Sequence, residues 1–258
     1  MKKRIDLGGS AKSPQDVRDL HALGLAFAEV AITDPLRFPE LLAEYRTLKD
    51  SLGLYYLCHG PREGDPNDVR ALESEFFPKI QRILPLMGEL EMKLLTLHLW
   101  LDRRFIKEDV LSFKVGLLKR IVGEASRAGI TVCIENLSEE AQDMARALNK
   151  IPRLMLTLDL GHAELLCEEN RSPGFIEQFP GRIQHIHLHD NRGGNSPKDD
   201  LHLPPGEGRI DFKRLFEALA RIQYHHTVTL ELKPHEIKAC LFYVSELISC
   251  LAHGQAAC

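Results

Sequence analysis

The chain has 258 residues, which is long for an average domain but ordinary for one closed α/β barrel. Hydrophobic residues make up 44% of it and charged residues 27%, enough for a sizeable core with a solvated exterior. A formal net charge of −4 argues against the basic face that nucleic-acid-binding domains usually carry. No stretch approaches the roughly 18 apolar residues of a membrane-spanning helix, so we expect no membrane partner.

The start of the chain and its cysteines indicate the compartment. Residues 1–7 are basic but are not followed by the apolar run of a secretory signal. The six cysteines are scattered and include no Cys-x-x-Cys pair. We therefore expect reduced thiols in a cytoplasmic protein, with Cys133 pointing into the interior as a small apolar residue.

Short β-rich runs alternate with longer amphipathic runs from one end of the chain to the other. The eight predicted strands occupy residues 3–8, 25–32, 54–59, 94–99, 130–135, 154–159, 183–189 and 227–232. All but the first are near-continuous apolar runs, as a parallel sheet buried on both faces requires.

Helix signals fill the intervals between these strands. Ser13 is an expected N-cap followed by Pro14, residues 109–128 carry one broad apolar face, and Pro234 opens a last helix that runs towards His253. Gly24, Gly53 and Gly129 follow helical patterns, where left-handed caps are expected. No linker or low-complexity tract interrupts the eight units. The pattern predicts one α/β domain over residues 1–258, a single (β/α)8 TIM barrel.

The informative feature is the polar residue at the end of most strands. These residues are His59, His98, Glu135, Asp159, His187 and Glu231. In a barrel all such ends lie on one rim, and a carboxylate on a buried strand must be paired or metal-bound. His162, Asp200 and His202 follow in the loops. A single strand-end histidine is more often a hydrogen-bonded core residue, but nine ligand-type side chains on one rim favour a metal centre. Mixed nitrogen and oxygen ligands suit Zn²⁺ or Mn²⁺.

Other polar residues have less specific roles. Glu29 has inward parity, so it either lines the pocket or pairs with a basic residue. His185 lies deeper in its strand than His187 and is expected to be a hydrogen-bonded core residue. His189 and Asp190 lie at the rim, where they would orient His187 or the substrate.

At these residues the chain resembles the xylose-isomerase-like barrel superfamily, which includes sugar isomerases, ketose 3-epimerases and endonuclease IV. The resemblance rests on the segments 134–136, 158–162, 187–190 and 200–208, which read IEN, LDLGH, HLHD and DLHLPPGEG. It implies one metal on Glu135, Asp159, His187 and Glu231 in epimerase-like members. It implies three zincs on all nine residues in endonuclease IV, so one to three divalent ions per chain are expected.

The first functional hypothesis is a sugar or sugar-phosphate isomerase or epimerase. Glu135 and Glu231 would transfer the proton through a metal-stabilised enediolate. The residues assigned to substrate binding are Trp100, Lys233, Arg192 and His189. The resemblance also implies a homo-oligomer, because such barrels often form dimers or tetramers.

The alternative is an AP endonuclease with a trinuclear zinc site, the only hypothesis that includes a nucleic-acid partner. The loop after His59 opposes it, because residues 60–66 read GPREGDP and contain no aromatic wedge to open DNA. A third hypothesis is a metal-binding barrel that has lost catalysis, since a fold alone does not establish activity.

Overall fold

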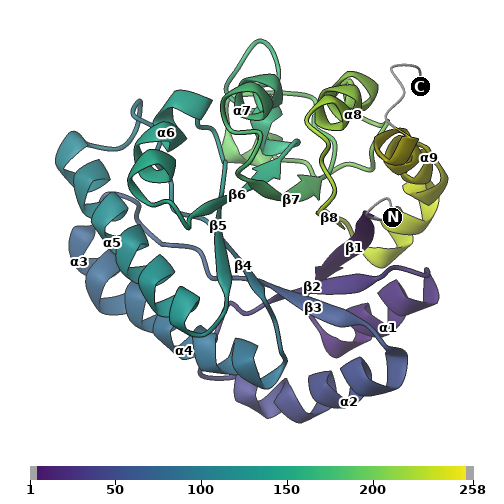
Figure 1. Cartoon of the computed structure of the whole chain (residues 1–258), viewed down its shortest axis with the longest axis horizontal. Coiled ribbons are helices and arrows are strands. Elements are labelled where there is room, and N and C mark those ends of the chain that lie inside the picture. Colours follow the sequence, from purple (N-terminus) through teal and green to yellow (C-terminus); the bar gives the residue numbers. More distant parts are fainter. Residues whose placement is uncertain (1–4, 254–258) are drawn as a thin grey trace.

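The computed structural model describes residues 5–253, and eight parallel strands close into a barrel in the order β1 to β8 (Figure 1). The strands are β1 (Asp6–Ala11), β2 (Phe27–Ala31), β3 (Tyr55–His59), β4 (Leu94–Leu97), β5 (Thr131–Glu135), β6 (Met155–Asp159), β7 (Ile183–Leu188) and β8 (Thr227–Leu230). Helices surround this barrel on the outside (Figure 1). The predicted TIM barrel is confirmed.

Strands β2 to β8 begin and end within two residues of the predicted bounds, but the prediction for the first strand was wrong. The predicted run stopped at Gly8, whereas β1 continues through Gly8 and Gly9 to Ala11. A Cβ on Gly8 would lie 2.4 Å from the Phe27 ring, and one on Gly9 would lie 2.5 Å from Leu20. These glycines therefore allow close packing inside a strand and do not mark a turn. Predicted positions 3 and 4 lie outside the described residues.

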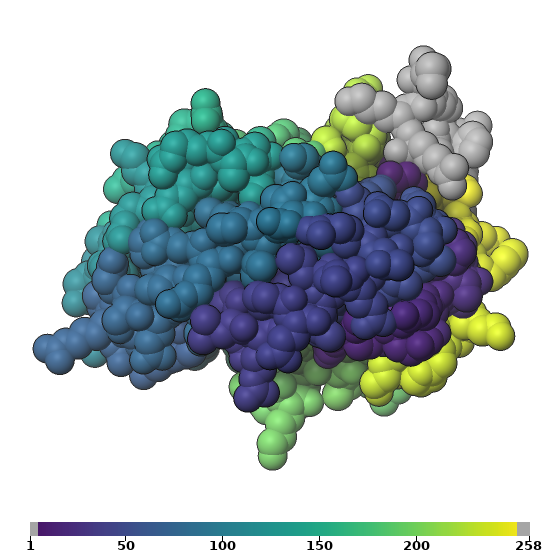
Figure 2. Space-filling model, turned by 90° about the horizontal axis from the view of Figure 1, so that it is seen from below, coloured from purple at the N-terminus to yellow at the C-terminus, as the bar shows by residue number. Residues whose placement is uncertain are grey.

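The helices follow the strands in turn. They are α1 (Pro14–Ala22), α2 (Leu42–Leu52), α3 (Val69–Ala71), α4 (Phe77–Glu89), α5 (Glu108–Arg127), α6 (Ala141–Lys150), α7 (Ser172–Gln178), α8 (Phe212–Arg221) and α9 (Pro234–His253). Ser13 caps α1 through a capping box with Asp16, as predicted. Gly24, Gly53 and Gly129 have the positive φ expected after helices. The first helix contacts the last, so purple and yellow segments lie side by side (Figures 1 and 2).

Side chains inside the barrel are layered because strand residues alternate between the two faces. The layer nearest the strand starts is apolar and includes Phe27, Leu57, Leu94 and Cys133. The next layer is polar and fully or almost fully buried, with Glu29, Thr96, Thr157, His185 and Thr229. The strand-end donors occupy the layer above. Strand parity thus places the predicted ligands on the inner face at the C-terminal rim.

A β-bulge in β7 sets the inward direction of two histidines. Leu156 of β6 pairs with Ile183, but the next residue, Thr157, pairs with His185, so Gln184 is an extra residue in β7. Beyond the bulge, Asp159 pairs with His187. Ile183 joins the core outside the barrel, whereas His185 and His187 face inward.

The long loop between β7 and α8 is fixed by Asp190, which is fully buried. Its Oδ2 accepts hydrogen bonds from the backbone N–H groups of Gly206 and Gly208, each at 2.9 Å. Its backbone forms an antiparallel bridge with Leu203. In the side view of Figure 2 a green segment, the colour of this part of the chain, projects below the barrel. Asp190 therefore anchors the loop that carries Asp200 and His202.

The cysteines agree only in part with the expectation. Cys58, Cys133, Cys167 and Cys240 are free thiols, and Cys133 lies inside the barrel as predicted. Cys250 is disulfide-bonded, so the prediction of six reduced thiols was wrong at this position. The spacing of cysteines along the chain does not show which two sulfur atoms come close together in the fold. Within residues 5–253, no helix is both long and apolar enough to span a bilayer.

Gly208→Ala should lower the free energy of unfolding by about 1–3 kcal/mol, because overpacking a close contact forces backbone shifts. Its Cβ would lie 2.2 Å from Asp190 Oδ1 and 2.4 Å from the Asn191 carbonyl oxygen. Urea denaturation measures the change. Gly116→Ala is the matched control, since its Cβ would meet nothing within 4 Å, and it should raise stability by up to about 1 kcal/mol as helix propensity predicts. Equal stability of the two variants would contradict this account of the loop.

Candidate metal centre

Glu135 lies at the centre of the donors, at the C-terminal end of β5, with its side chain fully buried. Its Oε1 is 3.1 Å from His187 Nδ1 and 3.2 Å from His162 Nδ1. Its Oε2 is 2.8 Å from His98 Nε2 and 3.3 Å from His59 Nε2. Each carboxylate oxygen therefore faces two imidazole rings, and each ring comes from a different strand end or loop.

Strands β5 to β8 bring together one group of four donors. One donor atom from each of Glu135, Asp159, His187 and Glu231 lies within 4.8 Å of the others. His187 Nδ1 is 3.4 Å from Glu231 Oε1 and 3.8 Å from Asp159 Oδ2. These are the four residues that the sequence analysis assigned to a single metal.

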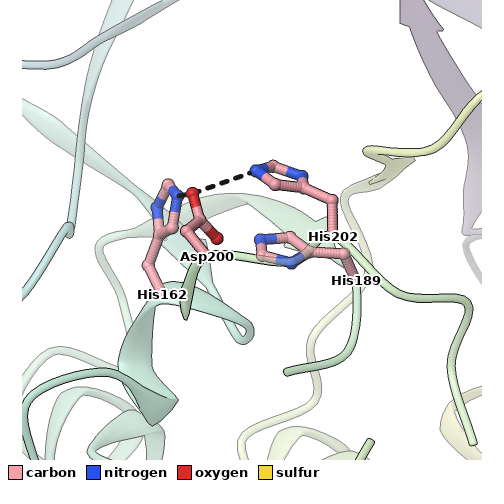
Figure 3. Close-up of side chains that lie close together, drawn as sticks. All are labelled: His162, His189, Asp200 and His202. Atoms are coloured by element: carbon pink, nitrogen blue, oxygen red, sulfur yellow. Dashed lines mark hydrogen bonds and ion pairs between the residues drawn. The ribbon is translucent and has the colours of Figure 1, made fainter. Parts of the chain in front are cut away.

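A second group of four lies in and around the rim loops (Figure 3). The donors of His162, His189, Asp200 and His202 lie within 4.8 Å of one another. Asp200 Oδ2 is 3.1 Å from His202 Nε2 and 3.3 Å from His162 Nε2. The His189 ring stacks on the His202 ring with centroids 3.9 Å apart. Three of the four are expected ligands. His189 was predicted to bind the substrate or to orient His187 and not to be a donor, although its spacing of two from His187 indicated the inner face.

The donor set fits a divalent cation, because several buried ligand atoms lack hydrogen bonds. Glu135 Oε2 and His98 Nε2 are buried and face each other at 2.8 Å without meeting the geometry of a hydrogen bond, and the buried His189 Nδ1 has no hydrogen-bond partner within the described part of the chain. A buried polar atom without a hydrogen bond costs about 1–3 kcal/mol, so this gathering of poorly satisfied atoms needs an explanation. Imidazole and carboxylate ligands together suit Zn²⁺ or Mn²⁺, and a cation would satisfy the unpaired lone pairs.

Asn136 and the donor Asp159 fix the ends of β5 and β6. The Asn136 side chain donates to the Asp159 carbonyl oxygen at 2.9 Å and accepts the Asp159 backbone N–H at 2.8 Å. Asp159 Oδ1 then accepts the backbone N–H of His162 at 2.6 Å. Asn136 therefore ties β5 to β6, and Asp159 sets the turn that returns His162 to the site.

The charges at the site are closely balanced. Burial opposes the ionisation of Glu135, but the nearby His98 and His187 charges and hydrogen bonds outweigh it and hold the pKa of Glu135 well below its usual value. Burial also lowers the pKa of His59, but the hydrogen bond and charge of Glu135 outweigh it and raise this pKa to about 9. Against the same burial, Asp200 and Glu231 raise the pKa of His202 to about 9. Without a cation, the site holds imidazolium–carboxylate pairs at neutral pH.

Below the donors, Glu29 of β2 pairs with two histidines of β7. A Glu29 oxygen lies 3.0 Å from His185 Nε2 and 3.0 Å from His187 Nε2. Of the two roles left open for Glu29, pairing with a basic residue is the one observed. His185 is fully buried and also contacts Thr227 Oγ1 at 2.6 Å, so the prediction of a hydrogen-bonded core residue is confirmed.

A cavity of about 440 Å³ opens beside the donors. Glu231 and His202 line it together with Lys12, Lys233 and the carboxylates of Asp16 and Glu236. Both lysines are exposed, and Lys233 Nζ lies 3.7 Å from Glu236 Oε1. The assignment of Lys233 to substrate binding stays a prediction.

Trp100 and Arg192 are held by other contacts. The Trp100 ring donates its N–H to Ser138 Oγ at 2.8 Å and stacks on Phe105. Arg192 is exposed and donates to the Glu207 carbonyl oxygen at 3.4 Å. Neither residue lines the cavity of about 440 Å³, so their assignment to the substrate remains a prediction.

Comparisons with known proteins agree with this architecture. The profile of a family described as "Xylose isomerase-like TIM barrel" matches residues 17–244. An uncharacterized protein of Methanocaldococcus jannaschii, MJ1614, is 25% identical over 187 residues, which span 70% of each chain. A D-tagatose 3-epimerase-like protein has the same fold, with a TM-score of 0.80, 20% identity and coverage of 96% of this chain and 99% of that one. The IolI protein solved with a bound zinc atom gives a TM-score of 0.80 at 14% identity, covering 95% of this chain and 98% of its own.

Metal binding at pH 7 should release protons, because a histidine must be neutral to bind a metal while His59 and His202 hold protons up to about pH 9. The apparent affinity for Zn²⁺ should therefore rise as the pH increases from 6 to 8.5. Calorimetric titrations in two buffers with different ionisation enthalpies measure the protons released.

The same pKa shifts should make the metal-free protein less stable as the pH rises from about 6.5 to 9, since the unfolded chain loses these protons near 6.5. Zinc affinity independent of pH over this range would be inconsistent with the balance of charges described.

Proposed function

Because the chain belongs to the xylose isomerase-like TIM barrel family, we propose that it is a divalent-metal-dependent isomerase or epimerase of sugars or sugar phosphates. The observation that carries the proposal is the buried group of Glu135, Asp159, His187 and Glu231 at the mouth of the barrel. The adjacent cavity of about 440 Å³ suits a small molecule. Proteins of the same fold include a D-allulose 3-epimerase and an L-ribulose 3-epimerase, which supports a sugar as substrate.

The four residues would hold the cation, which when bound would polarise a substrate carbonyl and acidify the neighbouring C–H. Glu231 borders the cavity with a side chain 12% exposed, so it is the carboxylate placed to remove that proton. Glu135 is fully buried beneath and comes from β5, so it would return the proton from the other side. Lys233 and Lys12 would bind a hydroxyl or phosphate in the same cavity.

A second candidate is an AP endonuclease, which one observation favours. His59 and His98 converge on Glu135, and a further four-donor group lies beside it, so more ligands are present than one metal needs. The loop after His59 favours the sugar instead. Its Pro61 is buried, and Glu63 turns inward to accept the Trp100 backbone N–H at 2.7 Å, so the loop presents no aromatic lip to DNA.

Metal content distinguishes the two candidates. For untagged protein that has never met a chelator, plasma mass spectrometry should give close to one Zn or Mn per chain, or two where the second donor group is also filled. Three zincs per chain would contradict the isomerase proposal and make abasic-site DNA the next substrate to test.

Glu231→Gln should lower turnover about 10²–10⁴-fold, the usual contribution of a general base, because the amide cannot accept the proton. The measurement is deuterium incorporation from D₂O next to the carbonyl, across a panel of ketoses and ketose phosphates. Glu207→Gln is the matched control, since Glu207 is an exposed carboxylate of the same rim that belongs to neither donor group. Turnover without solvent exchange in the wild-type protein would rule out proton removal by the solvent-accessible carboxylate of Glu231.

A further inference from the structure

Glu29 is an ionisable residue that is almost completely buried. It projects from β2 into the barrel interior and is 1% exposed. A carboxylate there must be stabilised by donors, since burial alone strongly disfavours its charge. The donors are the Nε2 atoms of His185 and His187, each 3.0 Å from Glu29 Oε2, and His187 Nε2 is also 3.1 Å from Oε1. Both rings come from β7, two residues apart.

The two nitrogens of His187 face different surroundings. Nε2 points down to Glu29, whereas Nδ1 points up to Glu135 Oε1 at 3.1 Å and Glu231 Oε1 at 3.4 Å. A neutral imidazole carries one N–H and one lone pair. If Nε2 donates its proton to Glu29, the lone pair of Nδ1 is directed into the four-donor group.

His185 fixes Glu29 in turn. Its Nε2 can donate to Glu29, and its Nδ1 lies 2.6 Å from Thr227 Oγ1, which can donate to it. Thr229 Oγ1 lies 3.0 Å from His185 Nε2, so this ring nitrogen contacts both Glu29 and Thr229. The chain of contacts runs from Thr227 through His185 and Glu29 to His187, so the carboxylate has little freedom to turn.

We propose that Glu29 is a positioning residue that holds His187 as the Nε2–H tautomer, with Nδ1 presented to the metal. The charge of Glu29 also makes Nδ1 a better donor, as carboxylate partners of metal-bound histidines generally do. The contacts of Glu29, His185 and His187 would also suit a separate cation. That arrangement would require His187 to lose both ring protons if Nδ1 binds a metal above, so hydrogen bonding is favoured.

This inference rests on the metal centre of the proposed function, but its test does not use sugar turnover. Glu29→Gln replaces one carboxylate oxygen with an amide NH₂, which is a hydrogen-bond donor. A histidine Nε2 that faces this group must then accept a hydrogen bond, so the ring is driven to the tautomer protonated at Nδ1. The affinity of the metal-free protein for Zn²⁺, measured by competition with a chromophoric chelator, should fall about 10–100-fold, the usual effect of losing such a partner. Glu139→Gln is the matched control, because Glu139 is also 1% exposed, accepts the backbone N–H groups of Leu101 and Leu137, and belongs to none of the donor groups. It should bind zinc as the wild type does.

A second measurement needs no folded Glu29 variant. In the zinc-loaded wild-type protein, ¹⁵N–¹H spectra of labelled histidine should show His187 protonated at Nε2, with its signals identified by their loss in His187→Gln. Protonation at Nδ1, or zinc affinity of Glu29→Gln equal to that of Glu139→Gln, would overturn the role of Glu29. A wild-type chain that binds neither zinc nor manganese would instead remove the metal centre itself, so the two failures are distinguishable.

Discussion

The structure depends on the burial of many ionisable side chains in the mouth of one barrel. Glu135 and Asp159 are fully buried, as are His187 and His189, and each needs a partner of opposite charge or a cation. The two oxygens of Glu135 serve four imidazole rings, so displacement of this one side chain would leave several others uncompensated. The closed barrel supplies the rigidity that such a concentration of charge requires, because the donors at the strand ends are fixed by the register of their strands.

Loops at the rim of the barrel supply the donors that the strands do not carry. Asp200 and His202 do not belong to any strand, and they reach the site because the buried carboxylate of Asp190 gathers the backbone of their loop. His162 reaches it through the turn that Asp159 caps. The loops therefore carry the residues that would adapt a common four-donor centre to a particular substrate, which is the usual division of labour in this fold.

Much of this arrangement could be predicted from the sequence, because buried parallel strands are apolar and a polar residue at the end of six of the eight is conspicuous. Convergence of the donors then followed from the closure of the barrel alone. The end of β1 could not be placed in the same way, since Gly8 and Gly9 resemble a turn until the rings and side chains they accommodate are known. The partner of Glu29 was equally hidden. Parity showed that it faces inward, but only the packed interior shows that it meets His185 and His187 from across the barrel.

The bulge at Gln184, a residue without a ligand role, decides which way the histidine side chains of β7 face. Because this extra residue realigns β7, His185 and His187 face inward while Ile183 faces outward. If the same residues alternated regularly, without the bulge, both imidazoles would face the helices, with every donor still present in the sequence. Relatives of such a barrel could thus retain all the ligand residues and still lack a metal centre, so an intact ligand list is an incomplete guide to function unless the register of the seventh strand is compared as well.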